Sequence, residues 1–264
     1  DSLNHCLFSG PAGLGKTTLS NALANELGSD IQVANGANLR SIKNVIPYLM
    51  RVNNRSVLFI DEIHRMTKLV EEFLYPVMED FKIDMSDGEE IISLQIPKFT
   101  LVGATTEAGV LSAPLRDRFK LKFTLELYDE LSLATLIEGN SKKLKIEMSD
   151  DAIFSLAKAS RGTPRIANGL LEWVRDYRIA KGLKVITYTD LVASLSMRGI
   201  HTDGSTEQDR KYLNFLKTQK NPVGLDTIVS SINVNKDTVL NVIEPFLLQS
   251  GKIFKTSKGR MSND

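Results

Sequence analysis

Gly10-Pro-Ala-Gly-Leu-Gly-Lys-Thr17 is the stretch that decides the fold, because it matches the phosphate-binding pattern G-x-x-x-x-G-K-[ST] at every fixed position. A short apolar stretch, residues 6–9, precedes it, and a stretch with leucines at helical spacing, residues 18–26, follows it. In this strand–loop–helix context, glycines turn backbone N–H groups inward at the positive end of a helix. The alternative is a glycine-rich turn without a ligand. Such a turn would not need a strand before it and a helix after it, so these flanking elements favour the P-loop. We therefore expect a P-loop that binds the phosphates of a nucleotide.

The loop residues have separate expected tasks. The expected phosphate-binding residues are Gly10, Pro11, Ala12, Gly13, Leu14, Gly15, Lys16 and Thr17. The Lys16 ammonium can reach the β and γ phosphates of a triphosphate, and the Thr17 hydroxyl can hold Mg²⁺. A nucleoside triphosphate and Mg²⁺ are therefore the ligands that this loop predicts.

An acidic pair follows the apolar run Ser56-Val-Leu-Phe-Ile60, which is typical of a strand buried on both faces of a parallel sheet. The pair is Asp61-Glu62. In a P-loop ATPase, Asp61 would help to hold the Mg²⁺, and Glu62 would orient or deprotonate the attacking water. A solvated strand end is the alternative for such a pair, but the P-loop earlier in the chain favours the ATPase interpretation.

The bulk composition limits the class of protein. The chain has 264 residues, 42% hydrophobic and 25% charged, as in a soluble globular protein with one large domain or a few small ones. The net charge is +1, so any contact with DNA has to come from a local patch. The three histidines are scattered, which argues against a zinc site, and the single cysteine, Cys6, excludes an intrachain disulfide. With no membrane-spanning run and no signal peptide, we expect a protein of the reducing cytoplasm with no membrane partner.

The segment from residue 39 to residue 96 has two helical stretches and a hairpin pattern. Residues 39–50 and 71–81 show helical spacing, interrupted by Pro47 and broken by Pro76. Residues 82–96 then alternate in hydrophobicity on either side of an Asp-Gly turn, which indicates a β-hairpin. Two interpretations stay open for it: a sheet edge packed on the core, or a protruding hairpin whose apolar face, with Ile92 and Leu94, docks another protein.

Polar groups follow the next expected strands. Residues 99–103 form an apolar run that ends in Ala104-Thr105-Thr106, where a polar side chain can contact a γ phosphate and the lytic water. Arg116 and Arg118 come after a proline turn, and residues 120–127 alternate as the last strand of the sheet. These arginines are either surface salt-bridge residues or, in a ring of P-loop subunits, the source of a cation for the neighbour's γ phosphate.

The remainder of the chain is mainly helical. Helical segments are expected at 131–144, 150–159, 163–178 and 189–195, with Thr163 as N-cap and Pro164 at the first helical position. Arg165 lies in that helix's first turn, where the dipole disfavours a cation unless a phosphate is present. After a polar linker at 201–206, helices at 210–217, 225–232 and 236–249 and two short strands form a winged-helix pattern. Its basic residues, suited to phosphate contacts, are Lys252, Lys255, Lys258 and Arg260.

Taken together, these residues resemble the AAA+ ATPases and, within them, the RuvB Holliday-junction branch-migration motors. The quoted matches are Gly-Pro-Ala-Gly-Leu-Gly-Lys-Thr-Thr (10–18), Leu-Phe-Ile-Asp-Glu-Ile-His-Arg (58–65), Leu-Tyr-Pro-Val-Met-Glu-Asp-Phe (74–81), Gly-Ala-Thr-Thr (103–106), Ser-Ala-Pro-Leu-Arg-Asp-Arg-Phe (112–119), Arg-Gly-Thr-Pro-Arg-Ile-Ala-Asn (161–168), Pro-Val-Gly-Leu-Asp (222–226) and Gly-Arg-Met (259–261). The resemblance implies an α/β P-loop AAA+ domain with a parallel sheet at 1–127, a small helical lid domain at 128–200 and a C-terminal winged-helix domain at 201–264. The family also carries an N-terminal segment, part of which contacts the adenine, and the resemblance begins after it.

The resemblance also implies a role for each motif residue. Lys16 and Thr17 match Walker A, with the phosphate-binding stretch continuing to Thr18, and Asp61 and Glu62 match Walker B. Thr106 matches sensor 1, Arg118 the arginine finger that acts in trans, and Arg165 the nucleotide-contacting sensor 2. The implied cofactors are ATP and Mg²⁺, and the implied metal ligands are Thr17 and Asp61.

The family resemblance implies a hexameric ring that encircles double-stranded DNA and drives branch migration of four-way junctions in recombination and repair. The 82–96 hairpin, with Ile92 and Leu94, matches the arm that docks on the junction-binding partner RuvA, and Arg260 falls on the wing that touches DNA. Two alternatives stay open. One is an ATP-switched winged-helix DNA-binding regulator, although base-reading side chains are scarce on the 236–249 helix. The other is a clamp-loader-like AAA+ ATPase.

Overall fold

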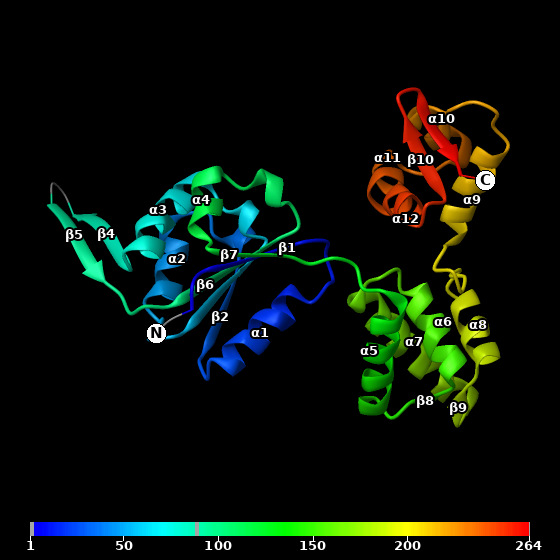
Figure 1. The fold of residues 1–264 in the computed structure, drawn as a ribbon, viewed down its shortest axis with the longest axis horizontal. Coiled ribbons are helices and arrows are strands. Elements are labelled where there is room, and N and C mark those ends of the chain that lie inside the picture. Colours follow the sequence, from blue (N-terminus) through cyan, green and yellow to red (C-terminus); the bar gives the residue numbers. More distant parts are fainter. Residues whose placement is uncertain (1–2, 88–89, 264) are drawn as a thin grey trace. The chain divides into compact units, whose positions relative to one another are not determined.

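The computed structural model describes residues 3–87 and 90–263, and the chain divides into two compact units, Asp1–Leu127 and Tyr128–Asp264 (Figure 1). The first unit is built on a five-stranded parallel sheet in the order β2-β3-β6-β1-β7. These strands are β1 (Cys6–Ser9), β2 (Ile31–Asn35), β3 (Val57–Asp61), β6 (Thr100–Thr105) and β7 (Leu121–Thr124). The expected parallel P-loop sheet is therefore confirmed.

Helices cover both faces of this sheet. Alternate residues of β1 and β3 point to opposite faces, so Leu7 and Leu58 join one buried cluster while Phe8 and Phe59 join another. The helices of the first unit are α1 (Lys16–Glu26), α2 (Ile42–Leu49), α3 (Lys68–Glu79) and α4 (Ala113–Arg118), with 3₁₀ turns η1 (Gly36–Asn38), η2 (Ile63–Arg65) and η3 (Ala108–Val110). Figure 1 shows α1 on one side of the sheet and α2, α3 and α4 on the other. Burial on both faces explains why β3 and β6 read as continuous apolar runs.

Two helices continue through a proline, and here the sequence-based prediction is wrong. Pro47 lies inside α2 and Pro76 lies inside α3. A proline inside a helix removes one backbone hydrogen bond and costs about 3 kcal/mol. The buried side chains of Leu74 and Val77 on either side of Pro76 offset this cost, and the Pro76 carbonyl still accepts the Asp80 N–H at the end of the helix.

The 82–96 segment forms a hairpin outside the central sheet. Strands β4 (Lys82–Asp87) and β5 (Glu90–Gln95) pair only with each other, as an antiparallel two-stranded sheet. Figure 1 shows this hairpin projecting from the rest of the first unit, so the sheet-edge interpretation is wrong. Ile83 is buried at its base, whereas Ile92 and Leu94 are 50% and 36% exposed. Of the expected Asp87-Gly88 turn, Gly88 lies outside the described residues.

The second unit begins with a four-helix lid. Its helices are α5 (Glu130–Lys143), α6 (Asp150–Ala159), α7 (Pro164–Lys181) and α8 (Tyr188–Ser196), and a short parallel pair, β8 (Glu147–Met148) and β9 (Val185–Ile186), joins two of its loops. Leucine and isoleucine side chains from all four helices meet in one buried cluster. Thr163 occupies the N-cap position and Pro164 the first helical position, as expected, but the Thr163 hydroxyl donates to the Arg161 carbonyl.

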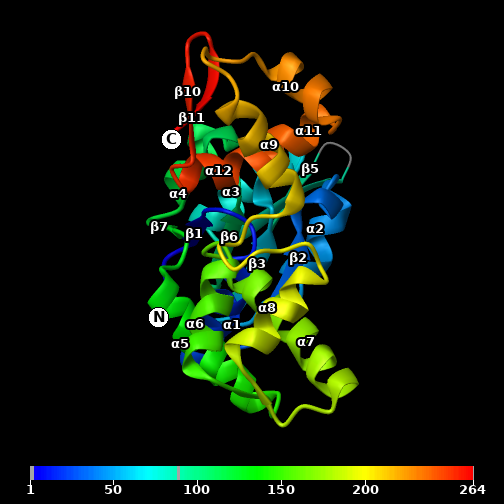
Figure 2. The same cartoon turned by 90° about the vertical axis from the view of Figure 1, so that its right-hand side faces the viewer.

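The rest of the second unit is a winged helix. It comprises α9 (Glu207–Lys217), α10 (Leu225–Ile232), α11 (Lys236–Thr238), a π-helical turn η4 (Val239–Ile243), α12 (Glu244–Gln249), β10 (Ile253–Thr256) and β11 (Gly259–Ser262). Figure 2 shows the β10–β11 hairpin beside α9 and α12. The expected single helix at 236–249 is divided by the π-helical turn just before Pro245, which lacks a backbone N–H. In the described part of the chain, no helix is long and apolar enough to cross a membrane.

Arg161 joins the lid to the winged helix. Its Nε donates to the Gly204 carbonyl at 2.7 Å, and a terminal nitrogen donates to Oδ2 of Asp209 at 2.5 Å. Its guanidinium carbon also lies 3.9 Å from the centre of the Phe246 ring. Asp209 is 1% exposed, and its Oδ2 also accepts the backbone N–H and the hydroxyl of Thr206. Since a buried carboxylate needs such donors, Arg161 helps to hold α9 and α12 against the lid.

Replacing Arg161 by methionine is expected to destabilise the second unit by about 2 kcal/mol, because Asp209 keeps its buried charge with fewer donors. Urea unfolding followed by the fluorescence of Trp173 measures this change, since Trp173 is the only tryptophan and lies in α7. Arg175→Met is the matched control, because its ion pair with Asp176 is exposed and is worth at most about 1 kcal/mol. Equal urea midpoints for the two variants would contradict the role of Arg161.

Candidate nucleotide-binding site

Three motifs meet at one edge of the central sheet. Strands β3, β6 and β1 are parallel neighbours, so their carboxyl ends lie side by side. The P-loop follows β1, Asp61 ends β3 and is followed by Glu62, and Thr105 ends β6 and is followed by Thr106. The Gly10 N–H donates to the Thr105 carbonyl at 3.2 Å, which ties the start of the P-loop to the end of β6. The carboxyl ends of parallel strands are where ligands bind in open α/β sheets.

The backbone of the P-loop requires glycine. Gly10, Gly13 and Gly15 have φ values of 140°, 83° and 91°, a region that side chains with a Cβ rarely adopt. A Cβ at Gly10 would also lie 2.3 Å from the carbonyl oxygen of Leu125. The loop therefore keeps a tight curl that ends at the N-terminus of α1, where backbone N–H groups and the helix dipole favour an anion.

Lys16 lies within the curl of this loop. It is the first residue of α1 and is 7% exposed, and its Nζ donates to the carbonyls of Gly10 and Pro11 at 2.8 and 2.9 Å. Thr17 and Thr18 lie in the first turn of α1 with exposed side chains. A cation enclosed by the loop and two exposed hydroxyls at the helix start are groups that fit a nucleotide's phosphates and Mg²⁺.

The acidic pair at the end of β3 is held in a fixed turn. Oδ1 of Asp61 accepts the Glu62 N–H at 3.1 Å, and Glu62 has a left-handed backbone with φ of 48°. A Cβ at Gly36 would lie 2.3 Å from the Glu62 carbonyl oxygen, so the chain after β2 packs directly against this turn. Oε2 of Glu62 accepts the hydroxyl of Thr106 at 3.1 Å and its N–H at 3.4 Å. The structure thus brings together Glu62 and Thr106, which the sequence places on separate motifs.

His64 is part of the same cluster, and reasoning from the sequence missed it. Its Nδ1 lies 3.3 Å from Oε2 of Glu62 and 2.9 Å from Oγ1 of Thr105, and its Nε2 lies 3.7 Å from Oε1 of Glu107. The side chain is 10% exposed. Its position two residues after Glu62 was the available signal, but only the left-handed turn at Glu62 brings the imidazole back beside the carboxylate.

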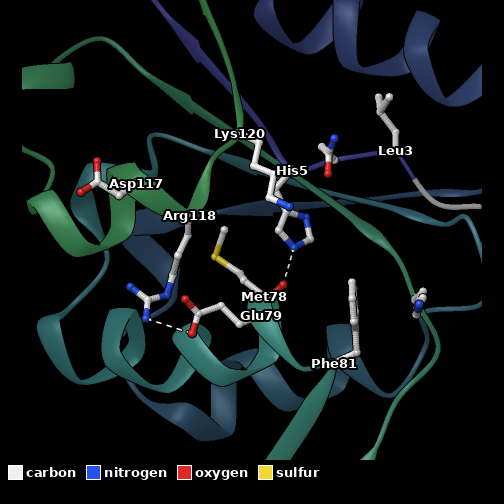
Figure 3. A pocket seen from close by; sticks show the side chains of 10 residues that line it. Leu3, His5, Met78, Glu79, Phe81, Asp117, Arg118 and Lys120 are labelled. Atoms are coloured by element: carbon white, nitrogen blue, oxygen red, sulfur yellow. Dashed lines mark hydrogen bonds and ion pairs between the residues drawn. The ribbon is translucent and has the colours of Figure 1, made fainter.

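Arg118 lines a pocket of the first unit. The pocket has a volume of about 400 Å³, and Figure 3 shows Arg118 reaching toward Glu79 on α3. A terminal nitrogen of Arg118 donates to Oε2 of Glu79 at 3.1 Å, another donates to the Pro114 carbonyl at 2.8 Å, and its guanidinium carbon lies 4.0 Å from the Tyr75 ring centre. In this structure Arg118 makes a salt bridge, which is one of the two interpretations that the sequence left open. Arg116, two residues earlier, is exposed.

His5 forms another wall of this pocket. Burial lowers its pKa, and its Nδ1 accepts the Leu101 N–H, so Nε2 carries the hydrogen that is donated to the Met78 carbonyl. Figure 3 shows Met78 between His5 and Arg118. A neutral, doubly hydrogen-bonded imidazole is a fixed part of the wall, and the cations that line the cavity are Lys98, Arg118 and Lys120.

The two arginines predicted in the second unit differ in their surroundings. Arg165 lies in the first turn of α7 with an exposed side chain and has no ion pair to the residues that the structure describes. Arg260, on β11, donates to both oxygens of Glu244 at 2.8 and 3.3 Å, and Glu244 is fully buried. The same carboxylate pairs with Lys255 at 2.6 Å and accepts the Tyr212 hydroxyl at 2.9 Å.

The expected basic patch on the wing is therefore partly neutralised, because two carboxylates pair with three of its four cations. Lys255 and Arg260 share the single carboxylate of Glu244, and Lys252 pairs with Asp203 at 2.6 Å, so the four cations keep a net positive charge. Among residues 3–87 and 90–263, Lys258 is the wing cation without an ion pair. The run of basic residues at the end of the chain does not indicate that a buried acid on a neighbouring helix pairs with them.

Comparison with known proteins agrees with this geometry. Three family models together match almost the whole chain: the P-loop domain of the Holliday junction DNA helicase RuvB at residues 1–125, the RuvB AAA lid domain at 128–201 and the RuvB C-terminal winged helix domain at 202–264. The chain belongs to the RuvB family. This RuvB-family chain is thus an AAA+ P-loop ATPase with a lid and a winged-helix domain, and the comparisons favour neither the regulator nor the clamp-loader alternative.

Relatives and solved structures resemble the RuvB-family chain over its length. It is 44% identical to the Holliday junction branch migration complex subunit RuvB of Rhodopirellula baltica, over 99% of this chain and 73% of that protein. It is 42% identical to the same subunit of Myxococcus xanthus, over 99% of this chain and 78% of that protein. The Thermotoga maritima RuvB Holliday junction branch migration motor matches with a TM-score of 0.83 at 38% identity, covering 100% of this chain and 86% of that one.

Proposed function

We propose that this chain hydrolyses ATP to drive branch migration of Holliday junctions in recombination and repair, as a subunit of a hexameric ring that works with a RuvA-type partner in the cytoplasm. The observation that carries the proposal is the meeting of Lys16, Asp61, Glu62 and Thr106 at the carboxyl edge of three neighbouring strands. A phosphate-binding loop, a metal-binding acid and a base beside a polar sensor are the parts that phosphoryl transfer to water requires. Membership of the RuvB family supports the reaction and the substrate.

In this proposal, each residue at the edge has one task. ATP supplies the phosphoanhydride bond that is broken, and Mg²⁺ neutralises charge on its phosphates. The loop from Gly10 to Thr18 binds the phosphates, with Lys16 as the cation, and Thr17 and Asp61 hold the metal. Glu62 takes a proton from the attacking water or orients it.

Two arginines complete the proposed site. Arg118 acts in trans on the γ phosphate of the neighbouring subunit, which requires it to exchange its contact with Glu79 for a phosphate. Arg165, a cation in the first turn of α7, acts as sensor 2 in its own subunit. Domains are proposed at 1–127 for the ATPase, 128–200 for the lid and 201–264 for the winged helix.

The hairpin β4–β5 is the proposed docking site for the RuvA-type partner. It stands outside the central sheet, its base is anchored by buried Ile83, and its strands present the half-exposed apolar side chains of Ile92 and Leu94. Exposed apolar side chains on a projecting element are typical of a protein-binding surface. The winged helix is the proposed contact with the duplex arms, and Arg260 and Lys258 lie on its wing.

A synthetic four-way junction with labelled arms tests the proposed function. With ATP, Mg²⁺ and a RuvA-type partner, the chain is expected to convert the junction into duplex products, and an ATP analogue that resists hydrolysis is expected to prevent this. The Ile92→Ser/Leu94→Ser variant is expected to lose the stimulation by the partner and to keep its basal ATPase activity. Val110→Ser, at a 63% exposed apolar residue of the same unit, is the control.

Each other outcome of this assay has a defined meaning. Junction DNA that stays intact while ATP is hydrolysed at the stimulated rate would contradict the motor. Binding to one DNA sequence in a footprint would favour the regulator alternative, and ATP-dependent loading of a ring-shaped protein would favour the clamp-loader alternative. Equal loss of stimulation in Val110→Ser would remove the hairpin from the docking proposal.

A further inference from the structure

His64 is a largely buried polar side chain of the nucleotide edge that the proposed roles leave without a task. It lies in the 3₁₀ turn η2, directly after Glu62, and is 10% exposed. Its two ring nitrogens face three oxygen atoms, those of Glu62, Thr105 and Glu107, at 3.3, 2.9 and 3.7 Å. An N–H at Nδ1 therefore has acceptors in Thr105 and Glu62, whereas the contact of Nε2 with Glu107 is longer than a hydrogen bond.

The hydrogen bonds around Glu62 gather on one of its oxygens. Oε2 accepts the hydroxyl and the N–H of Thr106 and lies beside Nδ1 of His64. For Oε1 no partner is seen among residues 3–87 and 90–263. A general base needs one oxygen free for the water and the other fixed, since a carboxylate that turns about its own bond loses the alignment that catalysis requires.

Thr105 connects the imidazole to the same strand end that supplies Thr106. The Thr105 side chain is fully buried, and its Oγ1 accepts the Glu107 N–H at 2.9 Å while contacting Nδ1 of His64. His64 is thus fixed to the end of β6, as Glu62 is through Thr106. His64 approaches Oε2 from η2 and Thr106 approaches it from the residue after β6, which restrains the carboxylate more than a single hydrogen bond can.

We infer that His64 is a positioning residue for Glu62: together with Thr106 it holds Oε2 and so keeps Oε1 available to the attacking water. This inference rests on the proposed role of Glu62 as the base. His64 touches neither nucleotide nor water in this scheme and acts only through the carboxylate. The competing explanation is a purely structural one, in which His64 only bridges the ends of β3 and β6 through Thr105.

Variants at position 64 distinguish these two explanations, because alanine removes both ring nitrogens while asparagine and glutamine each replace a different one. His64→Ala is expected to lower kcat for ATP about 10- to 100-fold, with the dissociation constant for ATP changed less than about twofold. His64→Asn places an amide N–H near the Nδ1 position and is expected to keep kcat within about threefold of wild type. His64→Gln reaches toward the Nε2 position instead and is expected to be as slow as His64→Ala.

A double-mutant cycle with Glu62→Gln gives the second readout. If His64 acts only through the base, His64→Ala should slow the residual turnover of Glu62→Gln by less than about twofold. Independent losses that multiply in the double variant would overturn the inference, as would a wild-type kcat in His64→Ala. An Asn variant as slow as Gln would also overturn it, and this comparison holds even if the alanine variant fails to fold.

Failure of the inference and failure of the proposed function give different results. Normal turnover in Glu62→Gln alone would remove the base role and with it the proposed mechanism. An inactive Glu62→Gln combined with a normal His64→Ala would leave the proposed function in place and reject only the positioning role of His64.

Discussion

The Glu62→Gln variant is expected to bind ATP as tightly as the wild type and to lose at least about a hundredfold in turnover, the usual range for removal of a general base. Glutamine keeps the size of the side chain, and its carbonyl oxygen can still accept the hydroxyl of Thr106. What it lacks is the basic carboxylate. Steady-state ATP hydrolysis and equilibrium binding of a fluorescent nucleotide measure the two effects separately.

Two further variants test whether this effect is specific to position 62. Glu72→Gln removes an exposed carboxylate of α3 that pairs only with Lys68 among the described residues, and turnover is expected to stay within about twofold of wild type. Asp61→Asn is expected to weaken nucleotide binding in a Mg²⁺-dependent manner, since Asp61 is a proposed metal ligand. Normal turnover in Glu62→Gln would mean that another group activates the water.

The strands and most helices could be predicted because their signals are local. The apolar run before Asp61 becomes β3, with its buried faces split between two clusters. The Thr163-Pro164 start becomes the first turn of α7. The sequence predicts interruptions at Pro47 and Pro76 because the cost of about 3 kcal/mol per proline is local, whereas the burial that outweighs this cost is tertiary.

The candidate site was predictable only where a motif fixes it. Lys16 and Asp61 follow from the P-loop and the strand end, because parallel strands bring their carboxyl ends together. The contact of His64 with Glu62 depends on one left-handed residue and on the pairing of β3 with β6, neither of which is visible as periodicity. The ion pair of Arg260 depends on Glu244, a buried acid on another element.

The Arg118→Ala variant is expected to bind ATP and to lose about a thousandfold in turnover, because an arginine that stabilises the transferring charge contributes at least that much in P-loop enzymes. Its present contacts do not account for such a loss, since the ion pair with half-exposed Glu79 is worth at most about 1 kcal/mol. Arg118→Lys keeps a cation for Glu79 without the planar fork that grips a phosphate, and we expect it to be nearly as slow. Arg116→Ala, on the exposed side of the same helix, is the matched control.

Mixing experiments show whether Arg118 acts on its own subunit or on its neighbour. In a ring whose nucleotide sites are shared between subunits, each Arg118→Ala subunit stops ATP hydrolysis at the neighbour's site that it faces. It thereby also interrupts the hydrolysis cycle of the adjacent subunits. The ATPase rate of mixtures should then fall more steeply than the fraction of wild-type subunits, while mixtures with Arg116→Ala should keep the wild-type rate. A strictly linear fall with Arg118→Ala would mean that the subunits work independently, and it would contradict the action in trans.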